Sequence, residues 1–325
     1  MKRLIHSIAL AILCFFLLSQ QVFAAQLLIP GGQVIGLELR DDSVIVAAFD
    51  DACGANAKEA GLCIGDAILS IDKKPIQCIE DVRAALDASQ GRVSVTVIRG
   101  AEQKNLSLTP VTTQDGPRLG VYLRQGIAGI GTITYCEPDT GKFGTLGHGV
   151  SNSGGQLLCM REGSAYSTEI LSVKKGQCGQ PGQLRGNADA LLPMGSLYKN
   201  TPQGVFGTMV RPIAGEPLPV ADFEDVRLGS ATIRSTIAGN SVREYSVEIL
   251  KIYPEDRSDH RNFLLKVTDP DLLAATGGIV QGMSGSPIIQ DGKLVGAVTH
   301  VLVNDPTRGY GIFIENMLDA AELVS

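Results

Sequence analysis

Hydrophobic residues occur along most of this chain in short runs that glycine and proline interrupt. Between residues 118 and 325 these runs alternate with turn-forming residues, and a helical spacing appears only near the end, at 314–323. Short apolar runs bounded by turn residues are typical of strands. The pattern predicts a mainly β domain over 118–325, long enough for two six-stranded barrels packed face to face.

A smaller unit precedes this domain. Its clearest feature is the pattern Ala-Gly-Leu-x-x-Gly-Asp-x-Ile-Leu-x-Ile-Asp at 60–72, followed by apolar residues at helical spacing over 79–88 and a strand pattern at 93–98. This order resembles that of bacterial PDZ domains. The resemblance predicts a small PDZ domain at 29–111, and the polar stretch 112–117, which ends in Gly-Pro, is interpreted as a linker.

PDZ domains bind extended peptides as an added strand, and loop amides capture the terminal carboxylate. By resemblance, the carboxylate loop is expected at Val34, Ile35, Gly36 and Leu37. The peptide would then lie between residues 37–40 and the helix at 81–87. A PDZ domain that only packs against its neighbour, holding it inactive or in register, is an open alternative.

The N-terminus has the pattern of an export signal. Lys2 and Arg3 precede an apolar run at 4–18, and Val22-Phe23-Ala24 offers a small-residue cleavage site. The run is short for a membrane span, which needs about 20 residues. Residues 1–25 are therefore predicted to be a signal peptide that exports the chain across the cytoplasmic membrane, with retention as a membrane anchor as the alternative.

Composition excludes several classes of partner. The formal net charge of −6 argues against binding to nucleic acid or to an anionic membrane surface, because both need a basic face. The four histidines and seven cysteines are scattered rather than paired at short spacing. No metal, no cofactor and no disulfide framework is therefore predicted.

The segment Gly282-Met283-Ser284-Gly285-Ser286-Pro287 carries the strongest chemical signal. An apolar hairpin with an Asp-Gly reversal at 291–292 follows it, which is how chymotrypsin-like proteases present a nucleophilic serine. The amides of Gly282 and Ser284 can then converge as an oxyanion hole. A glycine-rich turn with a solvated serine is the alternative reading of Gly-x-Ser-Gly, and Ser286 is the alternative nucleophile.

A nucleophilic serine needs a general base. His148 lies between glycines just after an apolar stretch, an open setting that favours proton transfer. His300 ends a strand and is expected to pack or to line a substrate pocket, and His260 lies in a charged run typical of a solvated loop. These settings make His148 the predicted base.

The third group of such a triad is a carboxylate that orients the imidazole. Asp269 ends an apolar strand and precedes a proline, so it is held at a strand-to-loop junction, although aspartate before proline is often only a turn former. Asp271, Asp259 and Asp222 are competitors that spacing does not exclude.

Residues 277–311 closely resemble the stage IV sporulation protein B peptidases of endospore-forming bacteria. Gly-Thr-Leu-Gly-His at His148 and Lys-Val-Thr-Asp at Asp269 match the same family. The resemblance implies a triad of His148, Asp269 and Ser284, with the aspartate fifteen residues before the serine, as the family shows.

The resemblance also implies a function. We expect an exported serine endopeptidase that cleaves itself and membrane-associated regulatory proteins, in the space between the mother-cell and forespore membranes. A PDZ scaffold or receptor with an inactive protease-like domain is the competing hypothesis, and a serine-directed fluorophosphonate distinguishes the two because an inactive domain does not react.

Overall fold

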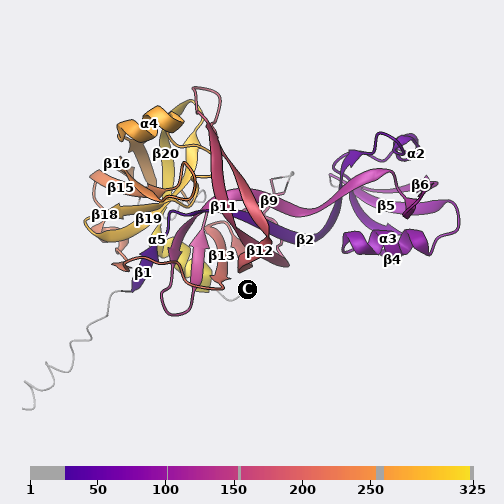
Figure 1. Ribbon diagram of the computed structural model, residues 1–325, viewed down its shortest axis with the longest axis horizontal. Helices are drawn as coiled ribbons and strands as arrows, with labels where there is room; N and C mark the ends of the chain where they lie inside the picture. The colour runs from indigo at the N-terminus through magenta and orange to yellow at the C-terminus, as the bar shows by residue number, and fades with distance from the viewer. Residues whose placement is uncertain (1–25, 101, 153–154, 254–259, 323–325) are drawn as a thin grey trace, which may run out of the picture.

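The computed structural model describes residues 26–100, 102–152, 155–253 and 260–322, and the predicted signal lies outside these ranges. Most of the described residues form β-strands, which confirms the predicted fold class. Two parts are evident in Figure 1: a large one that contains most strands, and a small one that two long strands, β2 (Val34–Phe49) and β9 (Val121–Cys136), connect to it. No helix of the described part is long and apolar enough to cross a membrane.

The first barrel closes because β2 pairs with strands on both of its edges. Its inner face is apolar and includes the buried residues Ile35, Leu37, Ile133 and Val205. Short strands β1 (Leu27–Pro30) and β14 (Leu218–Pro219) extend the sheet beyond the ring. Around the ring the strands follow the order β2, β9, β10 (Lys142–Thr145), β13 (Gly204–Met209), β12 (Gln183–Thr201) and β11 (Glu162–Lys174).

The second barrel is built from the later part of the chain. Buried Ile233, Val247, Phe263, Leu265 and Ile288 fill its interior. Two helices flank it, α4 (Pro270–Thr276) and α5 (Ile314–Glu322), and the 3-10 turn η1 (Phe223–Asp225) precedes it. The closed order is β15 (Gly229–Ser235), β16 (Arg243–Ile252), β17 (Phe263–Val267), β20 (Asp305–Phe313), β19 (Lys293–Leu302) and β18 (Pro287–Gln290).

A buried apolar cluster joins the two barrels. Tyr135 and Phe206 of the first barrel pack with Ala297 and Ile312 of the second, and Met317 of α5 completes the cluster. The prediction of two packed six-stranded barrels is confirmed, and the junction between the barrels is where a chymotrypsin-like enzyme places its active site.

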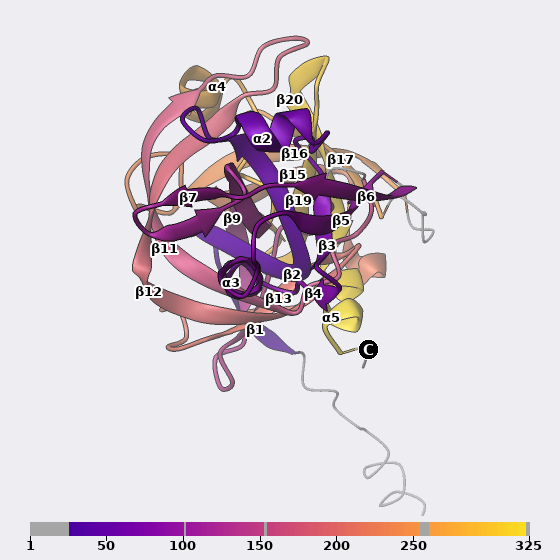
Figure 2. The ribbon, with the colours of Figure 1, turned by 90° about the vertical axis from the view of Figure 1, so that its right-hand side faces the viewer.

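The small part contains the predicted PDZ domain and faces the viewer in Figure 2. Its sheet combines the second half of β2 and the first half of β9 with strands that lie between them in the sequence. Buried Asp66 of the Gly-Asp motif accepts from Arg99 Nε at 2.7 Å, which ties the turn to the strand that follows the second helix. The remaining elements are α2 (Ala55–Glu59), β3 (Ala67–Ile71), β4 (Lys74–Pro75), α3 (Ile79–Asp87), β5 (Val93–Arg99), β6 (Glu102–Leu108), β7 (Val111–Thr113) and β8 (Gly116–Arg118).

The predicted boundary at residue 29 is wrong, because β1 and the first half of β2 pair with strands of the first barrel. The predicted PDZ domain is inserted between the first half of β2 and the second half of β9, rather than placed before the barrel. The stretch 112–117 is also no open linker, since it forms the hairpin β7–β8, whose second strand packs against α3.

The predicted carboxylate loop is wrong for the same reason. Val34, Ile35, Gly36 and Leu37 lie inside β2, paired with β9 on one edge and, from Ile35 to Leu37, with β11 on the other. A strand that is paired on both edges has no backbone amides available for a peptide carboxylate. Local sequence resembles a PDZ entry strand here, but the long-range pairing assigns it to the barrel.

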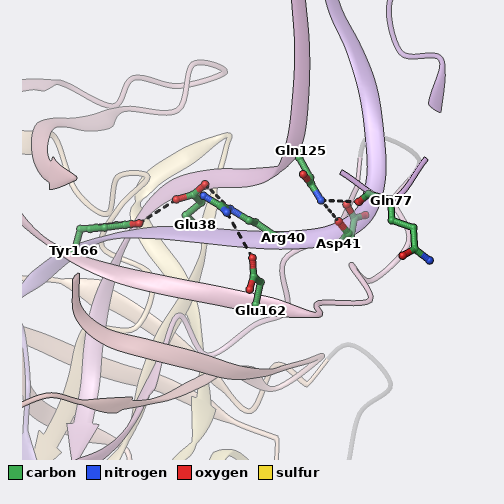
Figure 3. A network of polar contacts seen from close by, with 7 residues as sticks. All are labelled: Glu38, Arg40, Asp41, Gln77, Gln125, Glu162 and Tyr166. Atoms are coloured by element: carbon green, nitrogen blue, oxygen red, sulfur yellow. Dashed lines mark hydrogen bonds and ion pairs between the residues drawn. The ribbon is translucent and has the colours of Figure 1, made fainter. Parts of the chain in front are cut away.

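Polar contacts hold the two-stranded connection between the domains (Figure 3). Arg40 of β2 bonds Glu38 at 3.0 Å and approaches Glu162 of β11 at 3.5 Å. Further along, Gln125 of β9 donates to the carbonyls of Asp41 and of Gln77, the latter just before α3. These contacts attach the connection to both domains.

Candidate active site

The turn that carries Ser284 has a backbone that only glycine tolerates on either side. Gly282 has a φ of +100° and Gly285 a φ of +95°, both in the left-handed region. A Cβ at Gly285 would lie 2.0 Å from the carbonyl oxygen of Thr132, so β9 passes directly behind the turn. The sequence pattern at 282–287 thus forms the tight turn that it predicts.

Strand β9 of the first barrel holds this turn of the second barrel. The amide of Thr132 donates to Ser284 O at 2.9 Å, and Thr132 Oγ1 donates to Gly282 O at 2.8 Å. Thr134 Oγ1 donates to Gly285 O at 2.8 Å, and both threonine side chains are fully buried. Sequence analysis missed these residues, and the alternation Gly-Thr-Ile-Thr at 131–134 is the signal that could have found them.

A cavity of about 420 Å³ opens beside the turn at the junction of the barrels. Ser284, His148 and His300 contribute to its wall, together with Gly282. Ser286 is fully buried, which shields it from a substrate and argues against it as the nucleophile. The rest of the wall is mostly aliphatic and includes Leu37, Leu39, Ile127, Ile130, Leu146, Val150, Ile279, Val280, Val301 and Val303.

The backbone at 282–284 is compatible with the predicted oxyanion hole. The amide of Met283, between the two predicted donors, points away and donates to Val280 O at 3.1 Å. Among the described residues, no backbone carbonyl accepts from the amides of Gly282 or Ser284. Their role as oxyanion donors stays a prediction.

His148 follows β10, in a turn where Gly147 has a φ of +66°. Its Nδ1 lies 2.9 Å from Gly149 O, and because a carbonyl only accepts, this bond requires the proton on Nδ1. Nε2 is then the basic nitrogen. Burial lowers the pKa of the imidazole below its usual value, and the Gly149 carbonyl partly opposes that shift. His148 is therefore neutral at pH 7, as a general base must be.

Ser284 and His148 share the cavity without a hydrogen bond to each other in this structure. Ser284 Oγ instead donates to Thr299 O at 2.6 Å. Catalytic hydrogen bonds are often incomplete without substrate. To reach His148, the serine hydroxyl must leave the Thr299 carbonyl.

Asp269 lies elsewhere, at the N-cap of α4. One carboxylate oxygen accepts from the amide of Leu272 at 2.9 Å and the other from the amide of Ser246 at 3.3 Å. Asp269 does not line the cavity. The structure shows a helix-capping residue, and the triad role that the resemblance implies stays a prediction.

The other described candidates also lie outside the cavity wall. Asp222 is the N-cap of η1, and Asp271 is an exposed residue of α4. His260 approaches Gln203, with 3.4 Å between His260 Nε2 and Gln203 Nε2. Asp259 lies outside the described residues.

His300 is the second imidazole of the cavity. It lies on β19, and its ring centroid is 4.8 Å from that of His148, with the two planes inclined by 38°. Among the described residues that line this cavity, the two histidines are the only titratable side chains. His300 lines a pocket as expected, but sequence analysis did not predict its contact with His148.

The described part of the chain offers no metal-binding cluster. Nowhere in it do three or more His, Cys, Asp or Glu side chains gather in a way that could hold an ion.

Comparison with known families decides the classification. A family model described as SpoIVB peptidase S55 matches residues 115–318, and a PDZ domain model matches residues 54–99. The chain belongs to the SpoIVB peptidase S55 family. The two matched ranges include the Ser284 turn and the Gly-Asp motif, respectively.

Two curated relatives are named as zinc metalloproteases. One, from Rhizobium meliloti (strain 1021), is 30% identical over 142 residues, which is 43% of this chain and 34% of the relative. The other, from Agrobacterium fabrum (strain C58), is 28% identical over 177 residues, or 54% of this chain and 42% of the relative. The matched segments span less than half the length of either relative.

Similar solved structures include two proteases. The active form of the Rv3671c protease from M. tuberculosis is 14% identical, with a TM-score of 0.38 over 61% of this chain and 76% of that chain. The HtrA-type protease AlgW with a decapeptide is 11% identical, with a TM-score of 0.37 over 61% of this chain and 52% of that chain.

Proposed function

We propose that this SpoIVB-family peptidase is an exported endopeptidase in which Ser284 is the nucleophile and His148 the general base. The observation that carries the proposal is the meeting of both side chains in one cavity at the barrel junction. Ser284 Oγ attacks the scissile carbonyl while His148 Nε2 takes its proton, and the imidazolium then gives that proton to the leaving amine. The amides of Gly282 and Ser284 would hold the oxyanion. A deacylating water then repeats the same proton transfers.

The cavity favours an apolar side chain of the substrate near the scissile bond. Its wall is mostly aliphatic, and Ile130, Val280 and Val301 come from three different segments around Ser284. Burying an aliphatic side chain there removes apolar surface from water, which contributes roughly 25 cal/mol per Å². A charged side chain would be desolvated without a partner and is disfavoured.

The PDZ domain supplies a second peptide site, which we place at the first half of β9. Residues 121–125 pair with β2 on one edge, and no other described strand pairs with their second edge. Helix α3 lies against this part of β9 and against β8. A peptide added as a strand between β9 and α3 would bring its carboxylate to Leu119 and Gly120, where Gly120 has a φ of +78°.

The biological setting that we propose follows the family. The substrates would be other copies of this chain and membrane-associated regulators, cleaved during sporulation signalling between the mother-cell and forespore membranes. The signal-like pattern at 1–25 supports export, with anchoring by the same segment as the alternative.

Self-cleavage tests this function directly. Full-length protein is incubated, its fragments are mapped by mass spectrometry, and hydrolysis of an apolar peptide library is followed in parallel. Wild type and Ser286→Ala should cleave, whereas Ser284→Ala should not, because it removes one oxygen from a partly buried site and no core packing. Cleavage that persists in Ser284→Ala would contradict Ser284 as the nucleophile, and the absence of cleavage in wild type would favour the inactive-scaffold alternative.

A further inference from the structure

The cavity beside Ser284 contains two imidazoles in contact, and no carboxylate among its described lining residues. His148 comes from the turn after β10 in the first barrel, and His300 from β19 in the second. Their contact at 4.8 Å between centroids therefore crosses the junction of the barrels.

Residues 299 and 300 of β19 contact both reacting groups. The carbonyl of Thr299 accepts from Ser284 Oγ, and the next residue places its ring against His148. Two adjacent residues of β19 thus contact the nucleophile and the base. The strand is fixed on one side by β18, which directly follows the nucleophile turn.

The carboxylate implied by the family resemblance has other partners. Both oxygens of Asp269 accept backbone amides at the start of α4, from Leu272 and Ser246. To act on His148, Asp269 would have to give up a helix cap, and it lies outside the cavity wall.

We propose that His300 is the positioning residue of the His148 base, in the role that a carboxylate has in most serine peptidases. This inference rests on the proposed function. The His300 ring packs against His148 and limits its rotation, so that Nε2 stays directed at the nucleophile turn while Nδ1 donates to Gly149 O. The same contact keeps the imidazolium oriented when His148 takes the Ser284 proton.

The proposal has a consequence for charge. Because the two rings are in contact, protonation of one opposes protonation of the other, and they titrate as a coupled pair. The other described residues that wall this cavity, from β2, β9, the nucleophile turn and the remainder of β19, carry no titratable side chain. Activity should require both imidazoles to be neutral.

Full-length protein with His300→Ala or His300→Phe tests the proposal, and His260→Ala is the matched control because His260 does not line the cavity. His300→Ala removes the ring that packs against His148 and should lower kcat by about tenfold or more, with little change in KM. His300→Phe keeps a ring of similar width and should retain most of kcat. Because phenylalanine takes no proton, the acid limb of log kcat against pH should be less steep in His300→Phe than in wild type, whereas His260→Ala keeps the wild-type profile.

Two kinetic outcomes would overturn the proposal. A rise in KM with unchanged kcat and unchanged acid limb would make His300 a pocket wall only. A loss in Asp269→Asn as complete as in His148→Ala, with near-normal kcat in His300→Ala, would return the positioning role to Asp269.

A titration separates failure of this inference from failure of the proposed function. In Ser284→Ala, which needs no activity, the ring resonances of His148 should shift in two steps with pH, and in one step after His300→Phe is added. A single independent step in both proteins would refute the coupling whether or not Ser284 is the nucleophile.

Discussion

At the scale of single residues, the account depends on how burial and hydrogen bonds set the state of a few side chains. His148 is neutral because burial disfavours its cation, and its Nδ1 proton is fixed by the Gly149 carbonyl. Asp269 is fixed by two backbone amides instead of by an imidazole. Both side chains were found from their sequence neighbours, whereas the cavity that His148 shares with Ser284 and the contact of Asp269 with Ser246 join distant parts of the sequence.

The lowered pKa of His148 predicts an acid-dependent loss of stability. The unfolded chain binds a proton near pH 6.5, whereas the folded chain binds it only at lower pH. The contribution of this group to stability is therefore complete above 6.5 and falls as the pH drops toward the folded pKa. Urea unfolding at about pH 7.5 and about pH 5.5 should show a larger loss in wild type than in His148→Gln. Equal losses in the two proteins would contradict a partly buried imidazole with a lowered pKa.

The position of Asp269 predicts separate effects for two substitutions. Asp269→Ala removes the cap of α4 and should lower the free energy of unfolding by about 1 kcal/mol, whereas Asp269→Asn keeps an acceptor and should lower it less. Denaturant unfolding of the two variants checks this order. If both variants are as stable as wild type, the capping contact does not contribute.

At the scale of elements, β2 and β9 explain most of what local patterns could not predict. Each strand serves the peptidase barrel with one half and the PDZ domain with the other. Residues 34–37 have the local pattern of a PDZ entry strand, but they pair with β9, and residues 35–37 also pair with β11. The Ser284 turn was predictable because its glycines and the hairpin after it lie within a few residues, whereas Thr132 and Thr134 support it from a distant part of the sequence.

Two glycines on these paired strands, Gly36 opposite Ile130 and Gly129 opposite Leu37, give a matched test of this placement. A Cβ at Gly36 of β2 would lie 2.9 Å from the Ala188 Cβ and 3.1 Å from Thr168 Oγ1, whereas a Cβ at Gly129 of β9 meets no atom within 4 Å. Gly36→Ala should therefore lower the free energy of unfolding by about 1–3 kcal/mol, as overpacking does, and Gly129→Ala should lower it less. A harmless Gly36→Ala would favour the loop that sequence analysis expected.

At the scale of the whole molecule, the PDZ domain is an insertion into the peptidase domain, carried on the two strands seen in Figure 1. The presence of both domains could be predicted from the sequence, because each has its own motif. The insertion of one into the other could not be predicted, because it depends on the pairing of β2 with β9 between residues far apart in the chain.

This architecture predicts how the domains can be separated. A chain that begins at residue 118 lacks the first half of β2 and so one strand of a closed barrel, and it should not unfold cooperatively. A chain in which a short Asn-Gly turn joins Arg40 to Gly126 keeps the pairs Glu38–Ala128 and Leu39–Ile127 and should fold. Circular dichroism during thermal unfolding checks both chains, and cooperative unfolding of the chain from residue 118 would contradict the insertion.

The most direct test of the central claim, that Ser284 is a nucleophile activated by His148, is covalent labelling with a fluorophosphonate followed by mapping of the modified peptide. The account predicts modification at Ser284 in wild type and Ser286→Ala, none at this position in Ser284→Ala, and labelling slower by about a hundredfold or more in His148→Ala. Modification at Ser286, or labelling of Ser284 that His148→Ala leaves unchanged, would contradict it.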